Sequence, residues 1–273
     1  MRLGIIGGTG GMGTFFARVF REAGWEVLIS GPATALTNID LARTADVVMV
    51  SVPIKKTMAV IEEIAPHLRD DQVLCDLTSL KAAPVAAMLR TRAAVLGLHP
   101  MFGPTTPTLA GQTVVACPAR INPDQADLLL DALKAGGARV IEMDPAAHDQ
   151  LMAVVQGLTH YTTLTLAGTM RRLGVDLDTL LAVTSPVYRT EMALVGRLLG
   201  QDPALYAAIL QENPAMPAAL DAFREAAAEA ERAVRDGEKE FVDLFARDAA
   251  FFSAYIEEAT EESEALVQCL ATR

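Results

Sequence analysis

The sequence has few aromatic residues and no long apolar run. Only 5% of its 273 residues are aromatic, although 51% are hydrophobic, and an apolar fraction of that size excludes an intrinsically disordered chain. No apolar stretch approaches the ~18 residues that a membrane-spanning helix needs. The opening MRLGIIGG has none of the three regions of a signal peptide. We therefore expect a soluble, cytoplasmic protein with no membrane partner.

Cysteine is scarce as well. The three cysteines, Cys75, Cys117 and Cys269, are far apart and form no CxxC pair or histidine-containing cluster with metal-ligand spacing. Disulfide-stabilised secreted domains and structural zinc sites both need closer and more numerous cysteines. We expect buried thiols, a reducing compartment and no metal site.

Positive charge is in deficit, with 23 Lys and Arg residues against 34 Asp and Glu residues and a net charge of −11. Most of the imbalance lies in residues 218–264, which hold 14 acidic and five basic side chains. Nucleic acid is a poor partner for such a chain. The acidic stretch is most simply the solvated face of helices, and the rest of the chain can still bind an anionic ligand.

Residues 2–144 alternate short apolar runs with helical patterns, which is typical of a parallel sheet with helices on both faces. Strands are expected at 3–7, 26–30, 46–52, 72–76, 94–98, 113–117 and 139–143, with helices between them at 11–23, 55–66, 82–90 and 124–135. Later residues show only helical spacing, and helices are expected at 149–173, 178–182, 186–199, 203–210, 217–235 and 239–270.

These patterns predict an α/β fold of two domains, a Rossmann-type doubly wound parallel sheet in residues 1–145 and an all-α domain in residues 146–273. Ser185 precedes Pro186 as an N-cap precedes a proline in the first helical turn. The last helix carries an apolar stripe that needs a partner, and ordinary core packing is the simplest explanation for it. The stripe consists of Phe241, Leu244, Phe245, Phe251, Phe252 and Tyr255.

A glycine-rich loop joins the first expected strand to the first expected helix. The loop reads Gly8-Thr9-Gly10-Gly11-Met12-Gly13. It fits GxGxxG, a pattern that indicates dinucleotide binding in this strand–helix context. Gly8 permits the tight turn, Gly10 lets a pyrophosphate approach the backbone, and Gly13 allows close helix–strand packing. The helix N-terminus offers N–H groups to the phosphates, and all six residues are predicted to bind the cofactor.

The second expected strand ends without the residue that commonly selects NAD. NAD-specific loops have an Asp or Glu about 20 residues after the glycines, bonded to the ribose 2′-hydroxyl. Here the strand ends at Ser30, followed by Gly31 and Pro32, and no adjacent arginine is present for a 2′-phosphate. Ser30 is predicted to lie at the cofactor, which is NAD or NADP, and the choice between them stays open.

Polar residues follow the ends of three more strands, where ligands bind in doubly wound sheets. The segments read Ser51-Val52-Pro53, Asp76-Leu77-Thr78-Ser79-Leu80-Lys81 and His99-Pro100-Met101-Phe102-Gly103-Pro104. Val52 and Pro53 are predicted to contact the cofactor. His99 directly follows an apolar strand, and its position alone fits a catalytic residue and a strand-capping residue equally well.

The run from Leu96 to Pro104, LGLHPMFGP, together with the preceding DLTSLK, resembles the prephenate dehydrogenase family. Further matches follow in the family's order at Glu142, His148-Asp149-Gln150, Gln156, His160, Ser185–Arg189 and Gly196–Leu198. With the glycine loop the resemblance extends to about residue 252. It is closest to the dehydrogenase half of the bifunctional chorismate mutase–prephenate dehydrogenases. We expect a stand-alone dehydrogenase core, without the mutase domain or a regulatory module.

The resemblance implies a reaction of tyrosine biosynthesis, the oxidative decarboxylation of the dianion prephenate to 4-hydroxyphenylpyruvate and CO2 with hydride transfer to NAD(P)+. It implies that His99 hydrogen-bonds the substrate's 4-hydroxyl and helps to remove its proton, and that Ser79 assists there. It also implies that Gln156 and His160 line the substrate pocket and that Arg197 binds a substrate carboxylate.

The chemistry of these side chains suits that reaction. A neutral histidine, with a reference pKa near ~6.5, can accept the hydroxyl proton at cellular pH. The planar guanidinium of an arginine can hold a carboxylate through two hydrogen bonds. Gln156 and His160, four residues apart, share one face of a regular α-helix. Arg189 lies ~80° around the helix from Arg197 and is predicted to be structural or to support the residues that contact the substrate.

The helical domain is expected to close the substrate pocket, because pockets favour domain interfaces. His148 and Asp149 are predicted to be a capping and domain-joining pair at a helix start. The apolar stripes of the domain exceed what one helical layer covers, so we expect a homodimer formed mainly through this domain, as the resemblance also implies.

Three other functions stay open on the sequence alone. An arogenate (cyclohexadienyl) dehydrogenase would share nearly every motif, because arogenate differs from prephenate only in an amino group that replaces the side-chain keto group. A deazaflavin-dependent NADP oxidoreductase begins with a similar glycine loop but leaves His99 and Arg197 unexplained. A non-catalytic dinucleotide-sensing dimer would need the glycine loop but no base.

Overall fold

The computed structural model describes residues 1–272, which form two compact units. The first contains Met1–Met152 and the short segment Gln211–Pro214, and the second contains Ala153–Leu210 and the residues from Ala215 onward. The division predicted at residue 145 coincides with the start of helix α6 (Pro145–Met152), which belongs to the first unit. No helix within residues 1–272 is long and apolar enough to cross a membrane.

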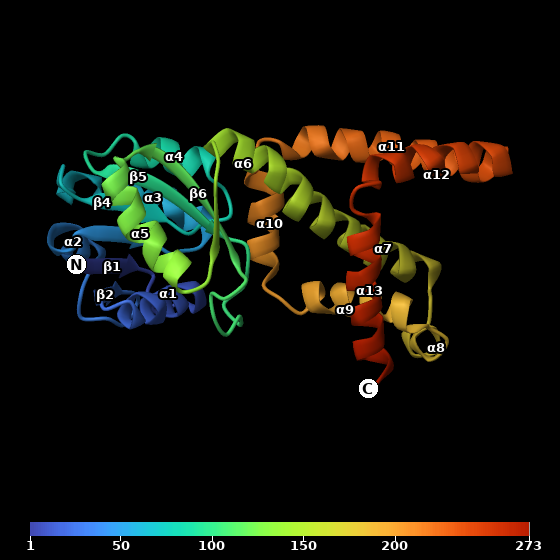
Figure 1. The fold of residues 1–273 in the computed structure, drawn as a ribbon, viewed down its shortest axis with the longest axis horizontal. Coiled ribbons are helices and arrows are strands. Elements are labelled where there is room, and N and C mark those ends of the chain that lie inside the picture. The colour runs from blue at the N-terminus through green and yellow to red at the C-terminus, as the bar shows by residue number, and fades with distance from the viewer. Residues whose placement is uncertain (273) are drawn as a thin grey trace. The chain divides into compact units, whose positions relative to one another are not determined.

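The first unit is built on a seven-stranded sheet with the order β2-β1-β3-β4-β5-β6-β7 (Figure 1). The strands are β1 (Arg2–Ile6), β2 (Glu26–Ser30), β3 (Val47–Val50), β4 (Val73–Asp76), β5 (Ala94–Pro100), β6 (Thr113–Arg120) and β7 (Arg139–Glu142). Each lies at a position predicted from the sequence. The predicted fold class, a Rossmann-type sheet followed by helices, is confirmed.

The sheet is not parallel throughout. Strands β1 to β5 are parallel, whereas β6 pairs with β5 in the antiparallel direction and with β7 in parallel. Residues 101–112, between β5 and β6, form no helix. Without a helical crossover the chain does not return to the opposite end of the sheet, so β6 runs back alongside β5.

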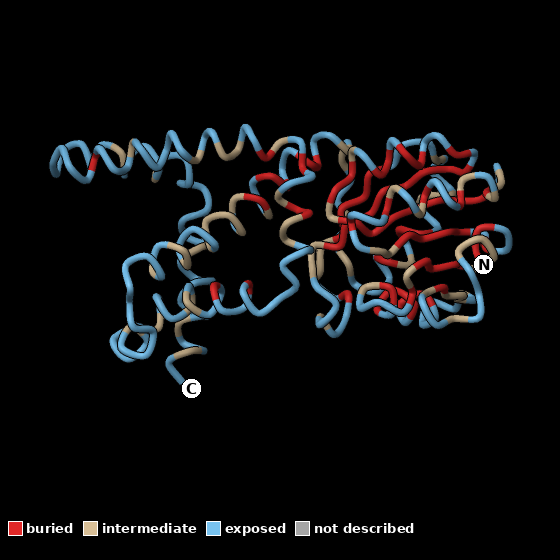
Figure 2. Tube along the Cα trace, turned by 180° about the vertical axis from the view of Figure 1, so that it is seen from behind, coloured by how far each residue is buried: buried red, intermediate tan, exposed pale blue. Residues whose placement is uncertain are grey.

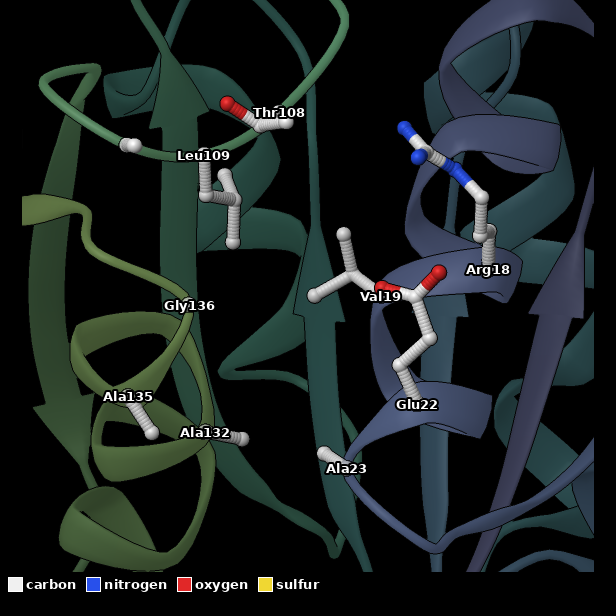
Figure 3. A pocket seen from close by; sticks show the side chains of 10 residues that line it. Arg18, Val19, Glu22, Ala23, Thr108, Leu109, Ala132, Ala135 and Gly136 are labelled. Carbon is white, nitrogen blue, oxygen red and sulfur yellow. The ribbon is translucent and has the colours of Figure 1, made fainter.

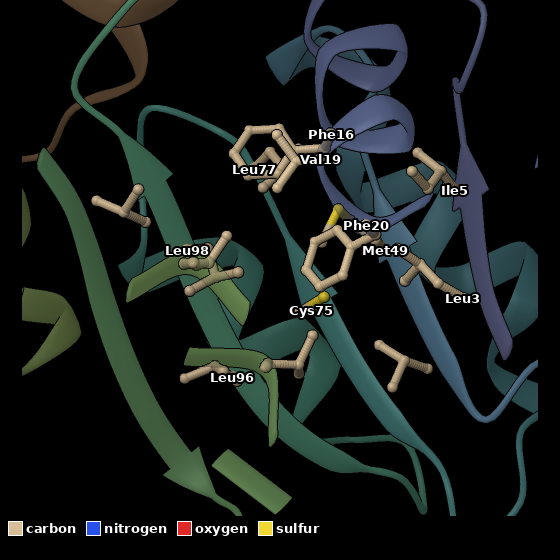
Figure 4. Close-up of a cluster of buried hydrophobic side chains, with 14 of the residues drawn as sticks. Leu3, Ile5, Phe16, Val19, Phe20, Met49, Cys75, Leu77, Leu96 and Leu98 are labelled. Atoms are coloured by element: carbon tan, nitrogen blue, oxygen red, sulfur yellow. The ribbon is translucent and has the colours of Figure 1, made fainter. Parts of the chain in front are cut away.

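Helices cover both faces of this sheet. One face is covered by α1 (Gly11–Glu22) and α5 (Pro123–Ala135), and the other by α2 (Asn38–Thr44), α3 (Ile54–Ile64) and α4 (Ala82–Met88). Because strand side chains alternate, Leu3 and Ile5 pack against Phe16 and Phe20 of α1 (Figure 4), whereas Ile6 packs on the opposite face. Figure 2 shows that the buried residues concentrate in this unit.

The second unit is helical, as predicted. Its helices are α7 (Thr159–Leu173), α8 (Leu177–Ala182), α9 (Pro186–Leu199), α10 (Pro203–Glu212), α11 (Met216–Asp236), α12 (Glu238–Phe252) and α13 (Ile256–Ala271), of which α10 ends in the segment assigned to the first unit. Ser185 occupies the N-cap position of α9 and Pro186 its first turn.

Two helices that the sequence predicts as continuous are interrupted. The predicted helix 149–173 consists of α6, a π-helical turn over Ala153–Leu158, and α7. The predicted helix 239–270 divides at residues 253–255 into α12 and α13. Hydrophobic spacing does not report such interruptions, because a π turn or a short bend shifts the apolar face without ending it.

Two expectations about burial are wrong for the single chain. The aromatic stripe of α12 is not core, since Phe245 is 67% exposed and Phe251 is 83% exposed. Cys269 is exposed, although Cys75 and Cys117 are buried as expected. Both exceptions lie in the helical unit, whose apolar surface is uncovered in one chain.

Candidate active site

Two loops meet at the point where the winding of the sheet reverses, between β1 and β3. In doubly wound sheets this crevice, outside the carboxyl ends of the strands, is where ligands bind. The loop after β3 contains Ser51, half-buried Val52 and exposed Pro53. A Cβ added to Gly7 would lie 2.2 Å from the carbonyl oxygen of Ser51. The glycine loop and the loop after β3 are therefore in direct contact.

The glycines of the first loop have different structural tasks. Gly7 has the positive φ of +80°, a left-handed backbone conformation that glycine adopts without strain. A Cβ on Gly8 would lie 2.6 Å from the Cβ of Ile29 in β2. A Cβ on Gly13 would lie 2.4 Å from the carbonyl oxygen of Gly7. Glycine at these positions is what allows α1 to begin so close to the sheet.

The same loop leaves room for an anion. Gly10 is the N-cap of α1 and has no side chain to bond the first N–H groups of the helix. Thr9, Gly10 and Gly11 are exposed and Met12 is half-buried. The first N–H groups of an α-helix have no acceptor within the helix, and its dipole favours negative charge there. The residues present fit the pyrophosphate of a dinucleotide.

Ser30 supports this loop from β2. Its carbonyl oxygen accepts hydrogen bonds from the backbone N–H groups of Gly7 and Gly8, each at 3.0 Å. Its side chain is buried, and the hydroxyl donates to Oδ1 of Asn38 at 2.8 Å. The hydroxyl of Ser30 thus points toward α2.

The loop after β5 packs against the glycine loop and α1. The ring of Phe102 contacts the rings of Phe15 and Phe16, with centroids 5.3 and 6.4 Å apart. A Cβ on Gly11 would lie 2.8 Å from the Cβ of Pro104. The HPMFGP run therefore holds the end of β5 beside the glycine loop.

A buried ion pair fastens β4 to β5. The carboxylate of Asp76 accepts hydrogen bonds from the ammonium of Lys81 and from the backbone N–H and hydroxyl of Thr78. The Lys81 ammonium also donates to the carbonyl oxygen of Leu98 in β5 at 2.8 Å. The side chains of Asp76 and Lys81 are fully buried. The DLTSLK run is thus a loop closed by its own side chains.

His99 and Ser79 emerge at the same edge of the sheet. His99 is the next-to-last residue of β5, whereas the sequence placed it just beyond the strand. Ser79 follows the end of β4, the parallel neighbour of β5. Ser79 is half-buried and His99 is 2% exposed.

A chain of hydrogen bonds leads from His99 to a carboxylate. Nδ1 of His99 lies 2.8 Å from Nε2 of His148, and Nδ1 of His148 lies 2.8 Å from Oδ1 of Asp149. The carboxylate of Asp149 also accepts the backbone N–H groups of Lys81 at 2.7 Å and Ala82 at 2.9 Å. His148 and Asp149 lie inside α6 and not at a helix start as predicted, and Asp149 binds the beginning of α4 instead.

The electrostatics of this cluster keep His99 neutral. Burial holds the pKa of His99 well below its usual 6.5, and positive charge on His148 or on Lys81 would lower it further. Burial acts to raise the pKa of Asp149, but hydrogen bonds from His148 and from the N–H groups of Lys81 and Ala82 outweigh it, and the pKa lies below its usual 3.8. Asp149 is therefore an ionised acceptor.

Sequence reasoning missed a fourth member of this cluster. Asn213, 2% exposed, donates from Nδ2 to the carbonyl oxygen of Asp149 at 2.8 Å. This contact places the segment Gln211–Pro214 with the first unit, far along the chain from the rest of it. An isolated asparagine between helices gives no sequence signal for such a role.

The helical unit brings together another group of polar residues. The ring of His160 in α7 meets the ring of Tyr206 in α10 edge to face, with centroids 4.7 Å apart. Burial raises the pKa of Tyr206, and the positive charge of Arg197 in α9 partly offsets this. Burial lowers the pKa of His160. The sequence had suggested His160 and Arg197, but not Tyr206.

The other predicted residues of the helical unit are Gln156, Arg189 and Arg197. Gln156 is half-buried within the π-helical turn, so the face-sharing of Gln156 with His160 that regular α-helical spacing predicts does not apply here. Arg189 and Arg197 are both exposed in the single chain.

A cavity of about 470 Å³ opens elsewhere on the first unit (Figure 3). Its lining comes from α1, from residues 108–110 and from α5, and includes Arg18, Glu22, Leu109 and Ala132. The predicted site residues lie outside that lining. Within residues 1–272, no group of three or more His, Cys, Asp or Glu side chains is arranged to hold a metal ion.

The doubly wound sheet, the glycine loop at its switch point and the neutral histidine at a strand end define a dinucleotide-dependent oxidoreductase. Comparison with known proteins narrows the class. Residues 26–142 match the prephenate dehydrogenase nucleotide-binding domain, and residues 144–250 match the prephenate dehydrogenase dimerization domain. The chain belongs to the prephenate dehydrogenase family.

Individual relatives of known sequence or structure support this family assignment. The chain is 35% identical to the T-protein of Haemophilus influenzae and 34% identical to a probable arogenate/prephenate dehydrogenase of Methanocaldococcus jannaschii. The matches cover 97% and 100% of this chain but 70% and 66% of those proteins. A prephenate dehydrogenase of Aquifex aeolicus, solved with hydroxyphenyl propionate and NAD+, has the same fold with a TM-score of 0.75 at 21% identity, over 94% of this chain and 98% of that one.

The buried ion pair generates a stability prediction. Replacing one member of a buried pair leaves the other charge uncompensated, which costs about 3–5 kcal/mol. Lys81→Met should lower the free energy of unfolding by that amount, measured by urea denaturation. Lys134→Met breaks an exposed pair with Asp131 and should change stability by less than about 1 kcal/mol.

Adding Asp76→Asn to Lys81→Met should recover part of the loss, because no unpaired charge then remains buried. A Lys81→Met variant as stable as the Lys134→Met control would contradict the role of this pair in holding β4 to β5.

Proposed function

We propose that the chain catalyses the oxidative decarboxylation of prephenate to 4-hydroxyphenylpyruvate and CO2, with NAD(P)+ as the oxidant. The observation that carries the proposal is the neutral, buried imidazole of His99. It lies at the carboxyl end of β5, the same end of the parallel strands at which the glycine loop follows β1. Family membership supports the substrate class.

The dinucleotide would be held by Gly8, Thr9, Gly10, Gly11, Met12 and Gly13, with Val52 and Pro53 beside them. When bound, the dinucleotide would supply the hydride acceptor for the carbon that bears the substrate's hydroxyl. Ser30 contributes through its carbonyl, which holds the N–H groups of Gly7 and Gly8. Its hydroxyl provides neither the carboxylate typical of NAD-specific loops nor a cation for a 2′-phosphate, so NAD and NADP are both tested below.

His99 would act on the 4-hydroxyl of prephenate, with Ser79 assisting. The imidazole accepts the hydroxyl proton as the carbon–oxygen bond becomes a carbonyl and the ring carboxylate leaves as CO2. The electron pair of the broken carbon–carbon bond makes the ring aromatic and gives a phenolate. The proton held by His99 then returns to the phenolate oxygen, which forms the phenol. The overall reaction therefore transfers one hydride to the dinucleotide and releases no net proton, and the histidine serves as base and then as acid.

Arg197, His160 and Gln156 would bind the substrate. The guanidinium of Arg197 suits one of the two carboxylates of the dianion. Tyr206, in ring contact with His160 and near the charge of Arg197, is added to this set. Because arogenate carries the same ring carboxylate and hydroxyl, these contacts alone do not separate it from prephenate.

The function is tested by following absorbance of the reduced nicotinamide with prephenate and arogenate, each with NAD+ and NADP+. We expect prephenate to be turned over with at least one dinucleotide, and with higher kcat/KM than arogenate. Higher kcat/KM for arogenate would reassign the substrate. Absence of turnover in all four combinations, with a dinucleotide still bound, would favour a non-catalytic sensor.

Replacing His99 tests its part in the reaction. His99→Asn should lower kcat by about 10²–10⁴, because a general base contributes a factor of that order. Dinucleotide affinity, measured by fluorescence titration, should change little. His67→Asn makes the same substitution outside the site and should retain activity. Unchanged turnover in His99→Asn would remove His99 from the mechanism.

We also propose that the protein is a homodimer formed through its helical unit. The match of residues 144–250 to a dimerization domain supports this assembly. Large apolar side chains exposed on that unit support it too, among them Tyr188, Leu194, Phe245 and Phe251, which are between 56% and 83% exposed. Large apolar side chains left exposed in one chain are typical of a surface that a partner covers.

Light scattering at micromolar concentration should give twice the 29.1 kDa mass of one chain. Phe251→Glu should shift the protein toward monomer, because it puts a charge on the uncovered face of α12. Leu128→Glu, at an exposed apolar position of the first unit, should leave the mass unchanged. A wild-type monomer would overturn the proposal.

A further inference from the structure

Three side chains, one from β5 and two from α6, form a buried chain of hydrogen bonds. His99, His148 and Asp149 are 2%, 0% and 2% exposed. Each link is 2.8 Å long. Water does not compete for these groups at such burial, so the position of each proton follows from the donors and acceptors present.

The protons can be placed from the carboxylate end. Asp149 accepts two backbone N–H groups, those of Lys81 and Ala82, and as an ionised carboxylate it has no proton to donate. Nδ1 of His148 must therefore donate to Asp149. In a neutral ring this leaves Nε2 of His148 as an acceptor, so Nδ1 of His99 donates to it. The acceptor nitrogen of His99 is then Nε2.

We propose that His148 and Asp149 are positioning residues that hold His99 in the tautomer whose Nε2 accepts the substrate's proton. The pair also stabilises the positive charge that His99 gains, because the carboxylate of Asp149 faces it through His148. This inference rests on the proposed function for its substrate. It replaces the capping and domain-joining role that the sequence suggested for the pair.

The proton transfer is balanced within these groups. The O–H bond of the substrate breaks, its proton binds Nε2 of His99, and the proton on Nδ1 stays in the hydrogen bond to His148. The titratable groups that face the ring are His148 from α6 and Lys81 from the loop before α4. Lys81 is itself paired with Asp76. Asp149 is the carboxylate on the far side of His148.

Asp149→Asn separates this role from simple packing. An amide nitrogen at this position would donate to Nδ1 of His148, which reverses both imidazoles and leaves Nε2 of His99 protonated. We expect kcat to fall by about 10²–10⁴, as it does when the aspartate of a serine-protease triad is replaced by asparagine. KM for prephenate and the dinucleotide affinity should change little.

His148→Gln is the more conservative variant, because it keeps a hydrogen-bond acceptor for His99. Its amide oxygen can still accept from Nδ1 of His99, so the useful tautomer survives while the link to the carboxylate is lost. The expected fall in kcat is on the order of tenfold, the worth of one hydrogen bond to a charged group. Asp144→Ala removes the acceptor of the first N–H groups of the same helix and should lower thermal stability without changing kcat.

A second readout does not need turnover. The chain has four histidines, so ring ¹⁵N signals of the full-length, dinucleotide-bound protein can be assigned by replacing each in turn. We expect His99 to be protonated at Nδ1 in the wild type and at Nε2 in Asp149→Asn. The acid limb of residual kcat against pH should also move to lower pH in Asp149→Asn, because the carboxylate no longer stabilises the imidazolium.

The inference is overturned if wild-type His99 carries its proton on Nε2, or if folded Asp149→Asn keeps full kcat. Should prephenate fail as a substrate, the ¹⁵N signals still decide the tautomer, so the two failures are distinguishable. If Asp149→Asn does not fold, the comparison of His148→Gln with Asp144→Ala decides instead. Equal kcat in those two variants would overturn the inference.

Discussion

The carboxylate of Asp149 is the constraint on which the candidate site depends. It is buried, and it is compensated by three hydrogen bonds that come from the start of α4 and from the neighbouring ring of His148. These bonds tie α6 to the loop that follows β4, and through His148 they orient the imidazole at the end of β5. An unsatisfied carboxylate at this depth would be strongly unfavourable. The geometry of His99 is therefore set by the folding of the unit itself.

The same loop serves two purposes at once. Lys81 neutralises Asp76 with its side chain and binds Asp149 with its backbone N–H. The loop after the next strand, β5, contributes Phe102, which packs on α1, and α1 begins at the glycine loop. A dinucleotide loop and a neutral histidine are thus connected through packed side chains in one unit. This explains in physical terms why DLTSLK and HPMFGP occur together in the sequence.

Much of the fold could be predicted, because short apolar runs and helical spacing report burial directly. All seven strands were found this way, and the glycine loop was found from its strand–helix context. The reversal of β6 was missed because residue spacing within a strand does not report its direction, although no helix was predicted between β5 and β6. The helix α2 was missed although Thr37 and Asp40 form a capping box at its start. His148 was noticed, but its bond to His99 joins residues 49 positions apart, a pairing that a single sequence does not specify. Tyr206 and Asn213 were also missed, because their contacts with His160 and Asp149 join residues far apart in the sequence.

A crystal structure with a bound dinucleotide and 4-hydroxyphenylpyruvate tests the central claim most directly. The account predicts that the phenol oxygen lies within hydrogen-bonding distance of Nε2 of His99, about 2.6–3.2 Å, while Nδ1 keeps its bond to His148. A phenol oxygen held by other groups, with the imidazole of His99 turned away from it, would contradict the account.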